Sequence, residues 1–339
     1  MLDTLKTLCY LSGASGSEDE VRDYILERVM PFSDEIMTDS MGNLIINKKG
    51  LKRCGRKILI CAHMDEVGII ITGIDDDGYL HFDFLGGVDR RVVIGKRVYI
   101  GKDRVCGVIG IKAYHHVSKN EEKSVPKRDE LYIDIGAKEK DEAKQLVALG
   151  DAAVFEDSVL EFGEGYLKAK AIDDRVGCAA LIKLIESELP CDCTFAFTVQ
   201  EEVGTRGAKI VSARLDPDVA IVLEGTTAAD LPEVPEGKRI CRLGDGLVIP
   251  FMDKGTVYSR ELYKEVTQLA NTNGIKWQTK TMIAGGTDAQ AIQRSGAGVD
   301  TIAISAPMRN IHSPACIAKI SDFEAMPRLA ALLLKSLSE

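Results

Sequence analysis

Four apolar runs, each about the length of one strand, constrain the fold of this chain most. They read RKILICAH at 56–63, CTFAFTVQ at 193–200, VAIVLEG at 219–225 and VDTIAIS at 299–305. Strands that are apolar on both faces belong to sheets covered on both sides, as in parallel and mixed sheets. Helical patterns alternate with these runs, at 173–189, 259–274 and 287–296. Strands that alternate with helices predict an α/β domain with a mixed or parallel sheet.

The chain changes character between residues 69 and 163. Short β-rich runs follow one another there, punctuated by Gly and Asp: VGIIITGI, GYLHFDF, RVYIG, VCGVIGIKAY and ELYIDIG. This pattern is typical of a small β-rich module. We therefore expect a discontinuous α/β domain, residues 1–68 plus 164–339, interrupted by a β-rich insertion at 69–163.

Composition excludes several classes of partner. The net charge of -9 does not favour nucleic acid or an anionic membrane as a partner. No apolar run reaches membrane-spanning length, and the N-terminus lacks the pattern of a signal peptide. The nine cysteines are scattered and form no C-x-x-C pair, which indicates reduced thiols. We expect a cytoplasmic protein.

Polar residues end or follow the apolar runs, and ligands of α/β proteins gather at the carboxyl ends of strands. These residues are His63, Asp65, Asp173, Asp174, Glu201, Glu202, Glu224, Asp230 and His312. Histidine nitrogens and carboxylate oxygens suit zinc or a similar divalent ion. A hydrolytic site with two such ions needs a bridging carboxylate, and a further carboxylate that takes a proton from water. The pattern therefore favours a dinuclear hydrolase.

Each residue also has a plainer interpretation. His63 fits a core histidine at a strand end, Asp173 or Asp174 a helix N-cap, and His312 a surface histidine. Glu201 and Glu202 fit a solvated strand end, because buried unpaired carboxylates are costly. It is the coincidence of all these residues at element ends that favours the metal site.

Four further residues stay open at this stage. Thr287 and Asp288, in GGTDA at 285–289, fit either the start of a helix or a substrate contact. Arg309 lies near His312 and fits either an orienting role or an exposed position. Arg175, which follows Asp173 and Asp174, fits either a pair with a carboxylate or a solvated position on the helix.

The chain resembles the dinuclear metallo-aminopeptidases of the glutamyl aminopeptidase and tetrahedral (TET) aminopeptidase type, some of which have carried an endoglucanase label. The matching motifs are AHMDEVG, AIDDRVG, QEEVGTRGA, LEGTTAAD, GGTDA and RNIHSPA, in family order from residue 61 to 315. The middle segment resembles the family's inserted dimerisation domain. The implied fold is a phosphorylase/hydrolase-like mixed-sheet metallopeptidase domain carrying that insertion.

The resemblance also implies roles for the site residues. His63, Asp173 and Glu224 hold one metal, while Asp173, Glu202 and His312 hold the other, so that Asp173 bridges. Glu201 is the general base and Asp65 the partner of His63. Many relatives have aspartate at the position of Glu224, and Asp230 is the fallback for that ligand.

The expected activity is removal of N-terminal residues from short peptides. The expected cofactors are two divalent ions per subunit, zinc or cobalt, with manganese as a third option. Self-association through the insertion is expected to give dimers, with a tetrahedral dodecamer as the larger assembly. Two alternatives stay open: a glycoside hydrolase of endoglucanase type, which needs two acids and no metals, and a non-catalytic peptide-binding assembly protein.

Overall fold

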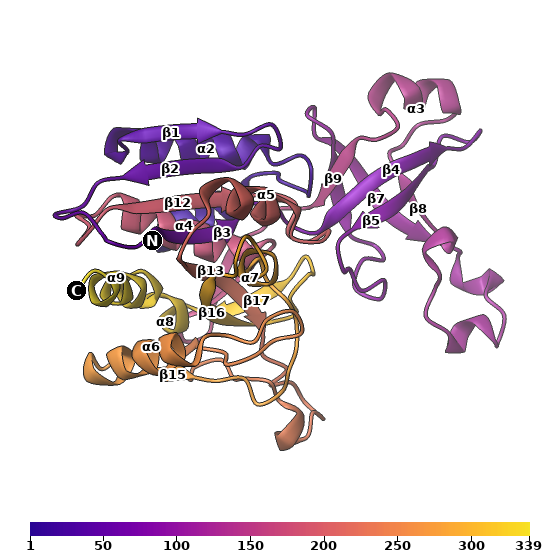
Figure 1. Cartoon of the computed structure of the whole chain (residues 1–339). Coiled ribbons are helices and arrows are strands. Elements are labelled where there is room, and N and C mark those ends of the chain that lie inside the picture. The colour runs from indigo at the N-terminus through magenta and orange to yellow at the C-terminus, as the bar shows by residue number, and fades with distance from the viewer.

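The computed structural model describes all 339 residues, which form a large mixed sheet flanked by helices and a small barrel beside it (Figure 1). The barrel extends away from the sheet on the side remote from both chain ends. The mixed α/β fold predicted from the apolar runs is confirmed. No helix combines the length and the apolar character that crossing a membrane requires.

The large sheet has 11 strands, nine of them in the order β1-β2-β12-β3-β13-β16-β17-β11-β10. These are β1 (Glu35–Thr38), β2 (Leu44–Lys48), β3 (Ile58–His63), β10 (Leu160–Phe162), β11 (Tyr166–Ala169), β12 (Cys193–Thr198), β13 (Val219–Thr227), β16 (Asp300–Arg309) and β17 (Cys316–Lys319). Two short strands, β14 (Leu247–Val248) and β15 (Trp277–Gln278), pair beside β16.

The four central strands β12, β3, β13 and β16 run parallel, and the outer strands are antiparallel. Every residue of β3 is buried, because helices cover both faces of a parallel sheet. Parallel pairing brings the carboxyl ends of β12, β3 and β13 to one edge. His63 at the end of β3 is therefore level with Thr198 at the end of β12.

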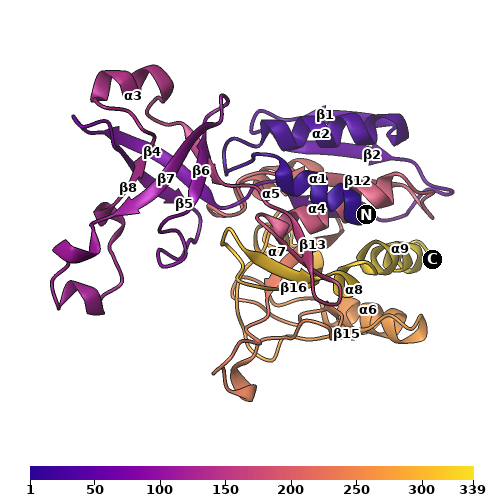
Figure 2. The same ribbon diagram turned by 180° about the vertical axis from the view of Figure 1, so that it is seen from behind.

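Helices pack on both faces of this sheet. α4 lies on β3 and β13 and is itself packed by α1, α2 and α9, while α5 and α7 pack together on the other face (Figures 1 and 2). The helices are α1 (Leu2–Tyr10), α2 (Asp19–Val29), α3 (Lys140–Leu146), α4 (Ile172–Ile185), α5 (Arg206–Leu215), α6 (Arg260–Thr272), α7 (Ala289–Gln293), α8 (Ile320–Phe323) and α9 (Met326–Leu337). The main core contains 64 buried residues, enough for an independently stable domain.

The barrel is closed by six strands in the order β4-β5-β8-β7-β6-β9. They are β4 (Gly68–Ile74), β5 (Leu80–Leu85), β6 (Arg97–Ile100), β7 (Val105–Ile111), β8 (Leu131–Asp134) and β9 (Ala152–Phe155). Helix α3 covers it, and a separate core of 14 buried residues fills it. β10, placed by the sequence in the insertion, instead pairs with β11 in the large sheet. All three residues of this strand are exposed, so no buried apolar face marks which sheet it joins.

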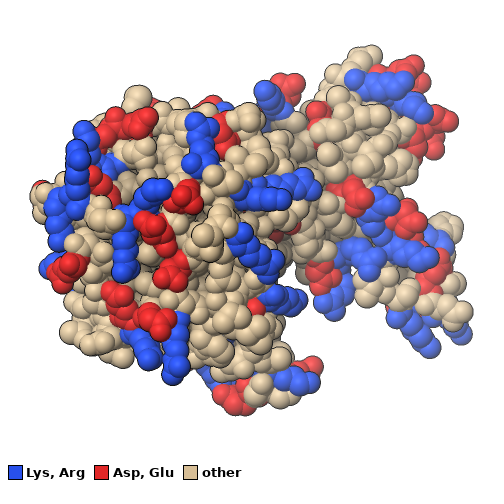
Figure 3. Space-filling model, viewed as in Figure 1, with Lys and Arg blue, Asp and Glu red and all other residues tan.

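Charged side chains of both signs are interspersed on the face shown in Figure 3. Lys and Arg lie beside Asp and Glu over both the sheet domain and the barrel. Opposite charges at such spacing largely cancel beyond a Debye length of about 8 Å at physiological salt. This face therefore steers charged partners only weakly.

Candidate metal centre

His63 ends β3 with its side chain only 2% exposed. Its Nδ1 lies 3.0 Å from the main-chain oxygen of Asp65 and 3.4 Å from Asp65 Oδ1. A carbonyl oxygen can only accept a hydrogen bond, so Nδ1 carries the proton and Nε2 has a free lone pair. Nε2 points to Glu224 Oε1 at 3.2 Å and to Asp173 Oδ1 at 3.7 Å.

Asp173 lies between the two histidines. Its Oδ2 is 3.4 Å from His312 Nε2, and its Oδ1 faces His63. The Oδ1 atom is buried and has no hydrogen-bond donor. A Cβ on Gly225 would lie 2.5 Å from this atom, so only glycine leaves room for the carboxylate beside β13. Asp173 is therefore positioned as a bridge with an unsatisfied oxygen.

Asp174 has a different role from its neighbour, to which a cis peptide bond joins it. Its carboxylate accepts the main-chain N–H of His63 at 3.2 Å and that of Gly177 at 3.0 Å. It therefore ties the end of β3 to the first turn of α4. Asp174 also lies within ligand distance of His63 and Glu224, but both of its oxygens already have donors.

Glu201 and Glu202 follow β12 after Thr198, beyond its last paired residue. Gln200 has a φ of 55°, so the alternation of the strand stops before the two glutamates. Asp65 accepts both of their main-chain N–H groups, from Glu201 at 2.9 Å and from Glu202 at 3.1 Å. Both side chains consequently turn into the site from one loop.

Glu224 in β13 lies at the site, whereas Asp230 does not. Asp230 accepts two hydrogen bonds from Arg309, Nε to Oδ1 at 2.8 Å and Nη2 to Oδ2 at 2.6 Å. This bidentate pair occupies both oxygens of Asp230. The geometry brings Glu224 to His63 and gives Arg309 a structural partner.

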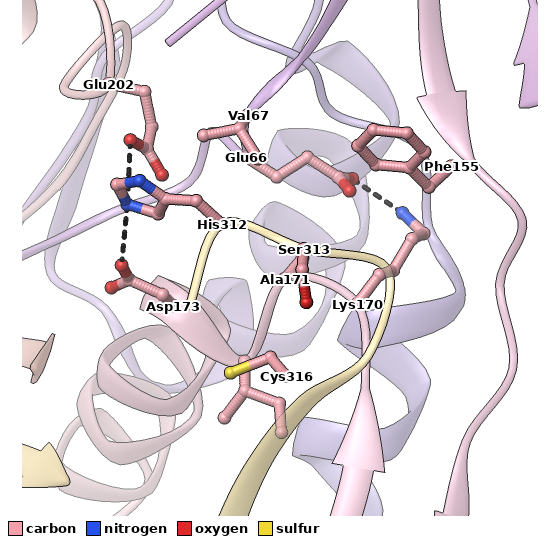
Figure 4. A pocket seen from close by; sticks show the side chains of 11 residues that line it. Glu66, Val67, Phe155, Lys170, Ala171, Asp173, Glu202, His312, Ser313 and Cys316 are labelled. Carbon is pink, nitrogen blue, oxygen red and sulfur yellow. Dashed lines mark hydrogen bonds and ion pairs between the residues drawn. The ribbon is translucent and has the colours of Figure 1, made fainter. Parts of the chain in front are cut away.

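His312 completes the cluster from the loop between β16 and β17. Its Nε2 lies 3.2 Å from Glu202 Oε2 and 3.4 Å from Asp173 Oδ2, as Figure 4 shows. Its Nδ1 faces the main-chain oxygen of Gly87, in the barrel, at 3.2 Å. Like His63, it therefore presents Nε2 to carboxylates.

The carboxyl groups of this cluster have perturbed pKa values. Burial raises the pKa of Glu202 to about 7 and that of Glu224 to about 8. Burial, together with the carboxylates of Glu224, Asp288 and Glu202, raises the pKa of Glu201 well above its usual range. Burial also tends to raise the pKa of Asp173, but its contacts with the imidazoles of His312 and His63 hold this pKa below the usual range. Buried carboxylates this close need a positive charge beyond two imidazoles.

The cluster has the ligand types of a divalent metal site. His63, Asp173 and Glu202 each offer a ligand atom, and all three atoms lie within 4.8 Å of one another. The unsatisfied Asp173 Oδ1 faces this space. Imidazole nitrogens with carboxylate oxygens fit zinc and its first-row neighbours. An α/β sheet with such a cluster at the carboxyl ends of its parallel strands belongs to the class of metallohydrolases.

Several supporting residues gave no clear signal in the sequence. Glu66 accepts Lys170 Nζ at 2.6 Å and Arg175 Nη2 at 3.2 Å, and all three side chains are buried (Figure 4). Arg175, left open above, is therefore an internal ion-pair partner. Glu18 Oε1 accepts the N–H of Gln200 at 3.1 Å, just before the glutamate pair. Only the folding of distant segments brings these partners together.

Thr287 and Asp288 precede α7 and are buried. Asp288 Oδ2 accepts the hydroxyl of Thr198 at the end of β12, and its Oδ1 has no donor. Thr287 Oγ1 accepts the N–H of Ala289 at 3.2 Å. Thr287 therefore hydrogen-bonds to the first residue of α7, and Asp288 joins the start of this helix to the end of β12.

The chain belongs to the M42 glutamyl aminopeptidase family, whose model matches residues 42–329. It is 30% identical to the lysyl aminopeptidase of Pyrococcus furiosus, over 99% of this chain and 97% of that one. It is therefore a metal-dependent aminopeptidase, a hydrolase that acts on peptide bonds. The resemblance stated from the motifs is confirmed, and this membership favours the aminopeptidase over the glycoside hydrolase and the non-catalytic protein.

Two solved structures share the whole fold. The TET aminopeptidase of a Thaumarchaeota archaeon from marine sediment has a TM-score of 0.94 and 34% identity, over 99% of this chain and 96% of that one. The TET1 peptidase of Pyrococcus horikoshii has a TM-score of 0.86 and 36% identity, over 98% of each chain. The latter is described as assembling into a tetrahedron or a large octahedral shell.

Proposed function

We propose that this aminopeptidase holds two divalent ions in sites that share Asp173. The "His63 site" consists of His63, Asp173 and Glu224, and the "His312 site" of Asp173, Glu202 and His312. The observation that supports this division is the position of Asp173, with Oδ1 towards His63 Nε2 and Oδ2 towards His312 Nε2. The donor set fits zinc or cobalt, and also manganese. Ions bound there would supply Lewis acidity and lower the pKa of a coordinated water.

Glu201 is proposed as the general base. Its side chain makes no hydrogen bond within the chain, whereas its N–H is fixed by Asp65 at 2.9 Å. The carboxylate is thus free to take a proton from the attacking water on Oε and to pass it to the nitrogen of the leaving peptide.

The proposed substrates are peptides with a free amino terminus. Glu201 is the one glutamate of the cluster that neither proposed metal site uses, so its carboxylate is left to face the amino terminus on which an aminopeptidase acts.

The assay of Glu201→Gln on aminoacyl anilides tests this function. We expect wild type to cleave free aminoacyl anilides and to leave their N-acetylated forms intact. Glu201→Gln should bind as much zinc as wild type and turn over at least ~10²-fold more slowly, the usual weight of a general base. The control is Glu261→Gln, on the exposed first turn of α6. Cleavage of acetylated anilides, or a fully active Glu201→Gln, would contradict the assignment.

We also propose that the chain divides into a catalytic domain and a dimerisation domain, the latter being the barrel from Gly68 to Phe155. The barrel exposes large apolar side chains, which favour burial against another chain: Val92, Val108, Tyr114, Val125, Leu146 and Leu149. Dimers formed through the barrel could build a larger shell, as described for the Pyrococcus horikoshii relative. Mass photometry of wild type and of Tyr114→Asp, a residue 77% exposed in one chain, tests this assembly.

The nine cysteines form no disulfide, which supports the expectation of a reducing, cytoplasmic compartment.

A further inference from the structure

The two histidines of the cluster are oriented by different domains. His63 is fixed through Nδ1 by Asp65, its neighbour in the catalytic domain. His312 is fixed through Nδ1 by the main-chain oxygen of Gly87, which follows β5 of the barrel. Apart from its contacts with Asp173 and Glu202, this is the only polar partner of the His312 ring. One imidazole thus depends on the inserted domain for its orientation.

The loop that carries Gly87 is closely fitted to the His312 site. A Cβ on Gly86 would lie 3.2 Å from Glu202 Cβ and 2.8 Å from Val67 Cγ1. Gly86 has a φ of 91°, a left-handed conformation that glycine adopts without strain. The loop therefore touches two residues of the same site: it packs on Glu202 and accepts a hydrogen bond from His312.

The segment that carries His312 has an unusual backbone conformation. His312 has a φ of 59° and Asn310 one of 54°, both strained for residues with a side chain. The His312 side chain is 31% exposed, against 2% for His63. A partly exposed ring on such a loop needs an outside partner to fix its direction.

We propose that the Gly86–Gly87 loop of the barrel is a positioning element of the His312 site, because it fixes the tautomer and the direction of the His312 ring. The inference rests on the proposed pair of metal sites. It gives the inserted domain a role at the reaction centre besides self-association. Since the His63 site has its own orienting residue, the loop governs only one of the two sites.

Zinc titration of three metal-free proteins tests the proposal: wild type, Gly86→Ala and Gly150→Ala. Gly150 is the matched control, because it lies in the same barrel with a φ of 89°, and a Cβ added to it would meet no atom within 4 Å. Both variants therefore carry the same backbone strain, and only Gly86→Ala displaces the loop. Calorimetry measures the dissociation constants of both zinc-binding steps. The step that disappears in His312→Ala is the one that belongs to the His312 site.

We expect Gly86→Ala to raise the dissociation constant of the His312 site by ~10–100-fold, the usual effect of losing an outer hydrogen-bond partner of a metal ligand. Its His63 site and its unfolding midpoint should match those of Gly150→Ala. Equal zinc binding by the two variants at both sites overturns the proposal. A wild type that binds no zinc would instead overturn the proposed function.

A second variant covers the case in which Gly86→Ala does not fold. Arg104 ties the barrel to the catalytic side, through Ser12 Oγ at 2.8 Å and Asp157 Oδ2 at 3.0 Å. Arg104→Met should also weaken zinc binding at the His312 site alone. Its control is Arg128→Met, which removes contacts made only within the barrel. An Arg104→Met protein with wild-type affinity at the His312 site would overturn the proposal equally.

Discussion

Asp65 Oδ1 accepts the main-chain N–H of Glu201 at 2.9 Å, although 136 residues separate the two in the chain. The other oxygen of Asp65 accepts the N–H of Glu202 at 3.1 Å and the hydroxyl of Ser15 at 2.6 Å. Asp65 therefore fixes the loop that carries both glutamates, in addition to lying beside His63. An ionised carboxylate suits this position because it can accept all of these hydrogen bonds.

We expect Asp65→Asn to lower kcat/KM by ~10–100-fold, in line with other residues that orient a metal site. The amide would face at least one N–H donor with its own NH₂ group, which pushes the loop away from the cluster. Steady-state kinetics on a free aminoacyl anilide measure the effect.

Asp322→Asn is the matched control for that variant. Asp322 is buried and accepts two main-chain N–H groups, from Gly244 at 2.6 Å and from Gly246 at 3.0 Å, with no contact to the cluster. Both variants should lose stability, but only Asp65→Asn should lose activity. Equal activity loss in the two would show that Asp65 acts through general stability.

Glu66→Gln should destabilise the fold by about 3–5 kcal/mol, because it leaves buried Lys170 and Arg175 without their counter-charge. Denaturant unfolding measures the change. The control is Asp76→Asn, which breaks a pair with Lys140 at 3.0 Å in which Asp76 is 97% exposed. That variant should change stability by less than ~1 kcal/mol, and similar losses in the two would contradict the role of burial.

The stability of the fold should depend on pH through Glu18. Burial raises the pKa of Glu18 from 4.5 to about 7. The folded state therefore binds the proton more tightly than the unfolded state, and this stabilisation is lost as pH rises from about 4.5 to about 7. Glu18→Gln lacks this dependence. The unfolding free energy of Glu18→Gln minus that of wild type should therefore rise by about 3 kcal/mol as pH rises from about 4.5 to about 7. Glu20→Gln, at an exposed position in the first turn of α2, which begins directly after Glu18, should show no such trend.

Metal removal should abolish activity and lower stability together. Ligands that bind only the folded state stabilise it by about 4 kcal/mol at 1,000 times their dissociation constant. Zinc added back to chelated protein should therefore raise the unfolding free energy in two steps, one for each site. His312→Ala should retain one step only. A single step in wild type would contradict the pair of sites.

Much of the cluster could be predicted from the sequence because each residue ends or follows an apolar run. His63 ends β3, Glu201 and Glu202 follow the end of β12, and Glu224 lies in β13, so the parallel pairing of these strands brings the four residues together. Asp173 is marked by the helix that follows it. The order of roles within the glutamate pair comes only from the family resemblance.

The supporting contacts could not be predicted in the same way. Gly87 contributes a main-chain oxygen, which no residue type encodes, and it lies in a different domain from His312. Lys170 and Glu66 are far apart in the chain, and either fits an exposed charge when taken alone.

Helix α9 begins separately from α8 because Pro327, in its first turn, cannot donate a helical hydrogen bond to the preceding segment.

The insertion of the barrel into the catalytic sheet has a consequence for biosynthesis. A ribosome releases His63 before the barrel, Glu202 and Glu224 after it, and His312 last of the cluster. Strand β3 pairs with β12 and β13, both made after the barrel. A nascent chain thus carries isolated ligands without a sheet to align them, while domains fold in order from the N-terminus. Proteolytic activity is thereby withheld until translation has passed β16.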